Sequence, residues 1–294
     1  MELTGWAGSV LGLIRQAVGF GGQVADRMTG GMAGRICRRL GIDWWGPSPD
    51  PSPIELQIGE VARGKPVTVP EVVARLDAIF ELAKTSPRGE DDGIASFTSL
   101  YRTITANVLR WLDEGRFADS EYLATLDIEF AERYLQALRS YAFDRAATPL
   151  CWRVLFDNRS VRRISPLHCA VAGVNAHINF DLAFATISTC VRLGVEFGVG
   201  DQYEAYLGVN DIFAANTLDL RDKFEAEYDP AQVDAVEKLF DDLAIVAGRE
   251  VAWKEAERIW PHRADAARMA VETRSMDLRA AVLGRGMLAN PFLR

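Results

Sequence analysis

The segment from Pro166 to Val191 is apolar enough to be buried on every side, yet it also contains several polar side chains. Ser165 and Pro166 have the form of a helix start and Gly194 that of a helix stop, so the segment predicts one long helix over about residues 165–191. A helix that is apolar nearly all round is typical of the centre of a helical bundle. We therefore expect an all-α, multi-helix bundle with this helix buried at its centre.

The polar residues of this segment fall on two opposite sides of the expected helix. At about 100° per residue, Asn175 and Asn179 lie within roughly 20° of His168. His177 and Asp181 lie on the opposite side, one helical turn apart. Buried polar groups need hydrogen-bonding partners, so each side must either meet neighbouring helices or border a site.

The rest of the chain also shows helical periodicity, and we find neither alternating strands nor internal repeats in the sequence. Apolar residues recur at helical spacing, and the segments that begin at Thr68 and Asp119 have the form of further helix starts. After residue 200 the expected helices cover about residues 201–216, 230–260 and 264–283.

Four prolines within residues 47–53 mark a domain boundary, because proline restricts its own backbone and that of the residue before it. We expect an extended linker there and a helical domain over residues 54–294. Residues 1–46 are rich in glycine and apolar residues, and we expect an accessory arm that packs on this domain or joins a homodimer. A membrane-surface helix is the alternative for the arm.

Composition narrows the classes of function. The 294-residue chain has a net charge of −8, which argues against a nucleic-acid-binding surface. We find neither a membrane-spanning apolar stretch nor a secretory signal, and we expect a cytoplasmic protein. The four cysteines form no CxxC pair, so neither a disulfide framework nor a cysteine zinc site is expected.

The residue types of the central segment suit acid–base chemistry. Imidazole titrates near neutral pH, and the carboxylate of Asp181 would orient His177 and stabilise its protonated form. Asn175 is the candidate for positioning a substrate. A purely structural pair is the alternative for His177 and Asp181, and hydrogen bonding between helices is the alternative for Asn175 and Asn179. His168, in the first turn, is expected at a cap or at the surface.

The segment also resembles the signature of a bacterial family catalogued only as a domain of unknown function. Gly173, Asn175, His177 and Asp181 stand at the matching positions, and the similarity extends over roughly residues 70–260. The family supplies no activity to carry over. The resemblance implies that Asn175, His177 and Asp181 are site residues, with these companions: Asp127, Asp201, Asn210 and Arg249.

Several of these companions have plain structural alternatives. Asp201 precedes an expected helix, where an N-cap is the simpler interpretation. Arg249 is either a salt bridge at the rim of the core or a clamp for a substrate carboxylate. Aromatic residues of the expected helices are core by default, with a hydrophobic ligand pocket as the alternative: Phe97, Tyr101, Phe130, Tyr134 and Phe180.

Three functions therefore remain open. The favoured hypothesis is an enzyme that uses no cofactor and acts on a small, fairly apolar molecule by acid–base chemistry, of the cyclase, isomerase, lyase or hydrolase type. His177, Asp181 and Asn175 would be its catalytic residues, and the substrate-binding candidates are Asp127, Asn179, Asp201, Asn210 and Arg249. The second is a metal-dependent hydrolase with a divalent cation at His177 and Asp181. The third is a non-catalytic ligand-binding or scaffold protein.

Overall fold

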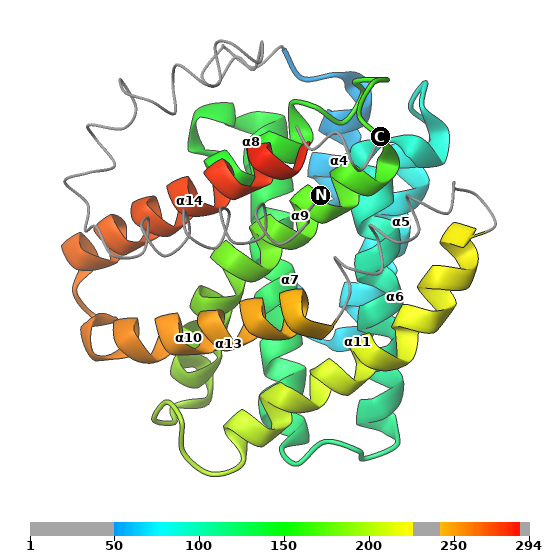
Figure 1. The fold of residues 1–294 in the computed structure, drawn as a ribbon. Helices are drawn as coiled ribbons and strands as arrows, with labels where there is room; N and C mark the ends of the chain where they lie inside the picture. Colours follow the sequence, from blue (N-terminus) through cyan, green and yellow to red (C-terminus); the bar gives the residue numbers. More distant parts are fainter. Residues whose placement is uncertain (1–49, 226–241, 289–294) are drawn as a thin grey trace, which may run out of the picture. The chain divides into compact units, whose positions relative to one another are not determined.

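The protein folds as a bundle of helices. The computed structural model describes residues 50–225 and 242–288, and no strand occurs in those ranges. The expected all-α fold is confirmed (Figure 1). The predicted arm over residues 1–46 and the first part of the helix expected over 230–260 lie outside the described residues. The α-helices are α4 (Pro53–Val61), α5 (Val69–Lys84), α6 (Gly93–Asp113), α7 (Ser120–Phe143), α8 (Leu150–Phe156), α9 (Pro166–Ala176), α10 (Leu182–Leu193), α11 (Gln202–Glu225), α13 (Asp242–Ile259) and α14 (Ala266–Leu288).

The helix starts follow from local side-chain chemistry. Thr68 and Asp119 cap α5 and α7 by accepting hydrogen bonds from backbone N–H groups of the first turn. Pro53, which we expected to end the linker, is instead the first residue of α4. Ser52 and Glu55 form a reciprocal capping box there. Proline suits the first helical position, because its fixed φ angle is helical and the N–H that it lacks would have no partner within the helix.

The predicted central helix is present over Pro166–Leu193 and ends at Gly194, whose φ of 68° is the left-handed conformation that favours glycine. It is not one uniform α-helix. A π-helical turn, His177–Asp181, joins α9 to α10. Such turns are rare and occur often at functional sites, and nothing in the local sequence predicted this one.

Other helices surround this central element. α6, α8 and α14 pack against α9, while α7 and α13 pack against α10 (Figure 1). Gly173 permits the close contact with α6, because a Cβ atom there would lie 2.4 Å from Cδ2 of Phe97. The segment most apolar in sequence is therefore enclosed, and its polar side chains face other helices.

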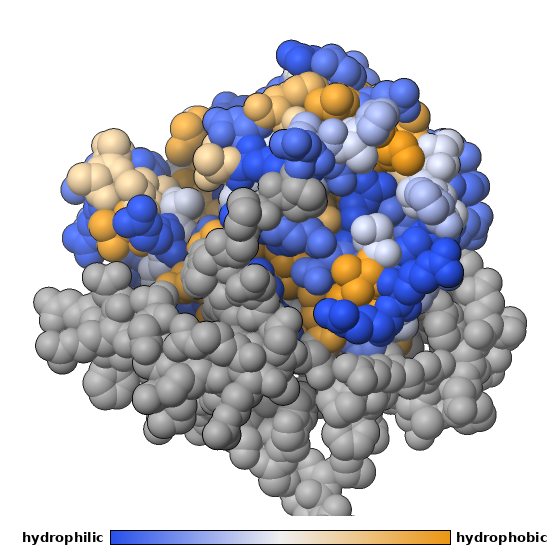
Figure 2. All heavy atoms as spheres, turned by 90° about the horizontal axis from the view of Figure 1, so that it is seen from above, coloured by the Kyte–Doolittle hydropathy of each residue, from blue (hydrophilic) through white to orange (hydrophobic). Residues whose placement is uncertain are grey.

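The exposed surface is mixed in character. On the face shown in Figure 2, hydrophilic residues surround separate apolar patches. Across residues 50–225 and 242–288, no helix has the length and apolar character required to cross a bilayer.

Candidate functional site

His177 lies in the π-helical turn, and its side chain is buried. Its Nδ1 atom lies 3.1 Å from Oδ2 of Asp181, so the pairing expected from their spacing is present. In a neutral imidazole held in this way, Nδ1 carries the proton and donates it to the carboxylate. The lone pair is then on Nε2.

Asp181 is held by two further donors. The Nε atom of Arg133 on α7 lies 3.1 Å from Oδ1, and Nε1 of Trp152 on α8 lies 2.9 Å from Oδ2. The start of α8 is itself anchored by Asp277 on α14, which accepts hydrogen bonds of 2.9 and 2.8 Å from the first two N–H groups of α8. Three helices outside the central element thus fix the carboxylate that orients His177.

Aromatic rings enclose the imidazole. Phe130 stacks on His177 with ring centroids 3.4 Å apart and planes within 8°. Tyr101 meets the ring edge-on at 4.5 Å, and Phe97 and Trp152 lie at 5.8 Å. This apolar surrounding lowers the pKa of His177, because burial disfavours the charged form more than Asp181 stabilises it. The imidazole is therefore neutral at pH 7.

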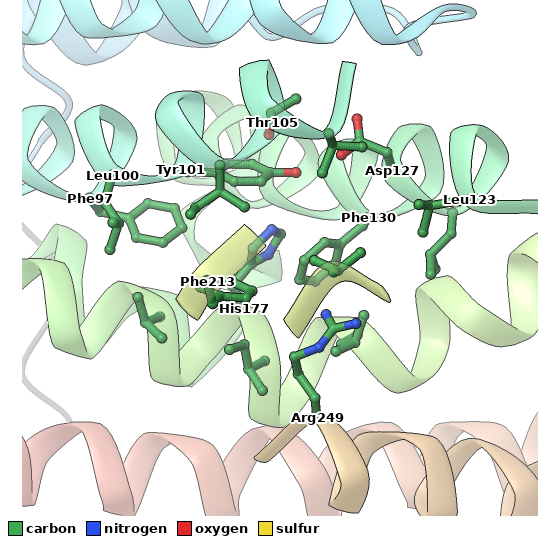
Figure 3. A pocket seen from close by; sticks show the side chains of 17 residues that line it. Phe97, Leu100, Tyr101, Thr105, Leu123, Asp127, Phe130, His177, Phe213 and Arg249 are labelled. Carbon is green, nitrogen blue, oxygen red and sulfur yellow. The ribbon is translucent and has the colours of Figure 1, made fainter. Parts of the chain in front are cut away.

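A cavity of about 70 Å³ lies beside His177 (Figure 3). Its walls come from helices far apart in the sequence, namely α6, α7, α9, α10, α11 and α13, together with the π-helical turn. Most of the lining side chains are apolar. The polar groups of the lining are Tyr101, Thr105, Asp127, His177 and Arg249.

Four of these polar groups have buried side-chain atoms that are not hydrogen-bonded within the described part of the chain. They are Oη of Tyr101, Oγ1 of Thr105, Oδ2 of Asp127 and Nε2 of His177. Buried polar atoms are nearly always paired, and an exception calls for an explanation such as a bound molecule or a catalytic role. All four atoms belong to residues that line the same cavity, and His177 and Asp127 are the two whose pKa values are shifted toward neutral pH or below it by burial.

Asp127 is buried on α7 without a compensating charge. Burial raises the pKa of this carboxyl group to about 7, so it is protonated in a substantial fraction of molecules at neutral pH. The cavity therefore has one neutral imidazole and one carboxyl group that can carry a proton. A pair of titratable groups with opposite shifts is typical of acid–base sites.

Arg249 reaches the cavity from α13 (Figure 3). Its Nε donates to Oδ1 of Asn210 at 2.7 Å, and its guanidinium lies 4.3 Å from the centre of the Tyr206 ring. Asn210 is not part of the cavity lining. In the structure it contacts the site through its hydrogen bond with Arg249, and a direct contact with substrate stays a prediction.

The structure does not bring all of the predicted residues to the cavity. Asn175 instead donates to the carbonyl of Ala280 on α14 at 2.8 Å, and Asn179 donates to Oδ1 of Asn175 at 3.0 Å. Neither residue is part of the cavity lining, and these hydrogen bonds are those of the structural alternative; a contact with substrate stays a prediction. Asp201 is exposed just before α11 and lies outside the lining.

Sequence reasoning missed four contributors to the site. Arg133 and Trp152 hold Asp181, Thr105 lines the cavity, and Asp277 anchors α8. These contacts join residues 29 to 127 positions apart, and periodicity within one helix carries no information on them. His168, expected at a cap or at the surface, is buried, and its Nδ1 lies 2.6 Å from Oγ of the N-cap Ser165.

The profile of a family of unknown function (DUF5995) matches residues 69–290. The chain belongs to this family. The match includes every helix that lines the cavity, and the resemblance inferred from the sequence is confirmed. Searches of curated proteins and of solved structures gave no match. DUF5995 membership names no activity, so the chemistry is argued from the site itself.

Proposed function

We propose that this DUF5995 protein is an enzyme that transfers protons on a small molecule without a redox cofactor, with His177 as the base. One observation carries the proposal. His177 has Nδ1 bound to a fixed carboxylate, while its Nε2 is buried, unpaired within the described chain, and part of the wall of a cavity. An imidazole oriented in this way is suited to general base catalysis.

The roles of the neighbouring groups follow from their protonation. His177 would accept a proton at Nε2, and Asp181 would stabilise the imidazolium that forms. Asp127, protonated in part near neutral pH, would return a proton to another atom of the substrate. Isomerisation, elimination, cyclisation and hydrolysis all use such a pair, and the geometry supports the shared proton transfer.

The metal-dependent alternative has less support from the contacts. Both oxygens of Asp181 already accept hydrogen bonds, from Arg133, Trp152 and His177. A cation at this carboxylate would compete with those donors. The non-catalytic alternative is separated from the proposal by experiment.

A cytoplasmic location belongs to the proposal as well. Cys151, Cys169 and Cys190 are buried free thiols, which agrees with a reducing compartment. The homodimer expected through residues 1–46 remains a prediction. Light scattering of the full chain and of a chain that lacks this segment measures it directly.

Deuterium incorporation tests the proton transfer even while the substrate is unidentified. The protein is incubated in D₂O with a small-metabolite extract, and mass spectrometry identifies the compounds that gain deuterium. We expect His177→Gln to lower the exchange rate about 10²–10⁴-fold with little change in melting temperature. His262→Gln, at a half-buried residue outside the cavity lining, is the matched control and should exchange normally.

The pH dependence of the deuterium-exchange rate is a second test of the proposal. The rate should fall in acid, as His177 becomes protonated below the ordinary histidine value of 6.5, and should fall again above about pH 7, as Asp127 ionises. Asp127→Asn should lower the rate at every pH, because asparagine cannot return the proton, and should remove the alkaline limb. Exchange that persists in His177→Gln would contradict the proposal, and its complete absence in the unmodified protein would favour the non-catalytic alternative.

A further inference from the structure

Arg249 is a buried cation whose contacts within the described chain include no carboxylate. The residue is only 4% exposed. Its partners are the amide oxygen of Asn210 at 2.7 Å, the backbone carbonyl of Tyr206, and the face of the Tyr206 ring. Burial lowers the pKa of this guanidinium, a direction that reflects missing charge compensation.

In another buried arginine of the same bundle, the positive charge is compensated by carboxylates. Arg159 is 5% exposed, and it pairs with Asp92 at 2.8 Å and with Glu55 at 3.1 Å. Buried charges are normally paired, because an isolated ion is costly to remove from water. Arg249 departs from this rule at the wall of the cavity that also contains His177.

Asp127 does not supply the missing charge. It lines the same cavity, but its pKa is raised by burial alone, and no hydrogen bond or ion pair joins it to Arg249 within the described residues. A carboxylate in contact with a guanidinium would have its pKa lowered. The positive charge is therefore available to a molecule that enters the cavity.

We propose that the ligand of this cavity is an organic monocarboxylate, whose carboxylate pairs with Arg249 while its apolar part lies against Phe130. A single charge fits, because Arg249 is the one arginine or lysine among the described lining residues. A phosphate dianion would need more donors, and Asn210 and Tyr206 already occupy part of the guanidinium. The inference rests on the proposed function in that the cavity must be a binding site.

The size of the cavity limits the ligand. About 70 Å³ corresponds to on the order of five water-sized positions, since one water needs roughly 10–15 Å³ measured in this way. A short-chain acid fits this volume without rearrangement. The carboxylate at Arg249 would leave the carbon chain between the aromatic wall and His177, where a proton could be removed from a carbon of the acid.

Histidine NMR tests the inference on the intact chain. The sequence has three histidines, so ring-labelled protein gives three Cε1–Hε1 signals, and His177→Gln assigns the one at the site. The probes are straight-chain carboxylates from acetate to hexanoate, each compared with its primary amide at constant ionic strength and pH 7. We expect the best carboxylate to shift the His177 signal with a Kd at least tenfold lower than that of its amide.

Variants separate the cavity from nonspecific anion binding. Arg249→Gln should raise the Kd of the carboxylate at least tenfold and leave the Kd of the amide nearly unchanged. Arg249→Lys retains the positive charge, so it should raise the Kd of the carboxylate by a smaller factor. This variant keeps the inference testable if Arg249→Gln is poorly folded. Arg102→Gln, at a surface groove between α5 and α6, is the matched control and should bind as the unmodified protein does.

Each outcome has a distinct meaning. Equal affinity for carboxylates and amides would overturn the monocarboxylate inference and leave the proposed function standing. Carboxylate binding that neither Arg249 variant weakens would overturn it as well. If no probe of either series shifts the His177 signal, the monocarboxylate inference is overturned. The deuterium-exchange experiment then decides the proposed function independently.

Discussion

The central helix has polar side chains on two opposite sides, and the two sides meet different surroundings. Asn175 and Asn179 face α14, where they are hydrogen-bonded to each other and to the Ala280 carbonyl. His177 and Asp181 face α6, α7 and α8 beside a cavity, and there Nε2 of His177 has no partner within the described chain. Two similar polar stripes in one apolar helix therefore meet different surroundings, one hydrogen-bonded within the protein and one beside a cavity, where we propose the chemistry takes place.

The largest effect that we expect is on the pH dependence of stability in the variant Asp127→Asn, and it tests the side of the central helix that borders the cavity. The folded-state pKa of Asp127 is raised from 3.8 to about 7, so its stabilising contribution is complete below pH 3.8 and is lost as pH rises to about 7. We expect the stability of the variant relative to the unmodified protein to grow by about 4 kcal/mol between pH 4 and pH 8.

Urea unfolding at several pH values measures this difference. Asp77→Asn, at an exposed ion pair on α5, is the matched control and should change the stability by at most about 1 kcal/mol. A flat response for Asp127→Asn would mean that the carboxyl is solvated or paired, and the cavity would lose its second titratable group.

Asp181→Asn should have the next largest effect. The substitution removes the charge that pairs with Arg133 and accepts a hydrogen bond from neutral His177, and breaking a buried ion pair costs about 3 kcal/mol or more. Chemical unfolding measures the loss. Asp119→Asn is the control, because asparagine caps a helix as well as aspartate does, and its expected change is below about 0.5 kcal/mol. Similar small losses for both variants would show that the Asp181 network is not tightly coupled.

Gly173→Ala tests how closely the chemical side is packed. The added methyl group would collide with Phe97, whose ring meets His177 edge-on, and such overpacking costs about 1–3 kcal/mol. Gly286→Ala, at an exposed site in α14 with no atom near the added Cβ, should instead stabilise by about 0.5–1 kcal/mol. Thermal unfolding of the two variants should therefore shift in opposite directions.

Asn175→Ala should give the smallest effect and the most direct test of the comparison. Loss of its hydrogen bonds to Ala280 and Asn179 should cost about 1–2 kcal/mol. Deuterium exchange by the folded variant should remain normal. If the variant instead lost exchange at unchanged stability, the asparagine side would be part of the site, and the division between the two sides would be wrong.

The sequence was most informative on features that depend on neighbouring residues. The caps at Thr68, Asp119 and Ser165 and the stop at Gly194 were all recognisable, as was the pairing of His177 with Asp181. The sequence was least informative about the N-terminal end of the helical domain. The four prolines in residues 47–53 predicted an extended linker, whereas Ser52 and Pro53 begin a helix.

The sequence by itself determined that the segment over 165–191 is a buried helix with two polar sides, because helical periodicity and capping are local properties of the chain. Only the tertiary structure decided which side became a candidate site. Whether a buried polar atom finds a partner depends on the helices packed against it, so Asp127, Arg249 and the cavity beside His177 came together through contacts between distant segments. The π-helical turn belongs to the same category, since it is a feature of how α9 and α10 fit among their neighbours.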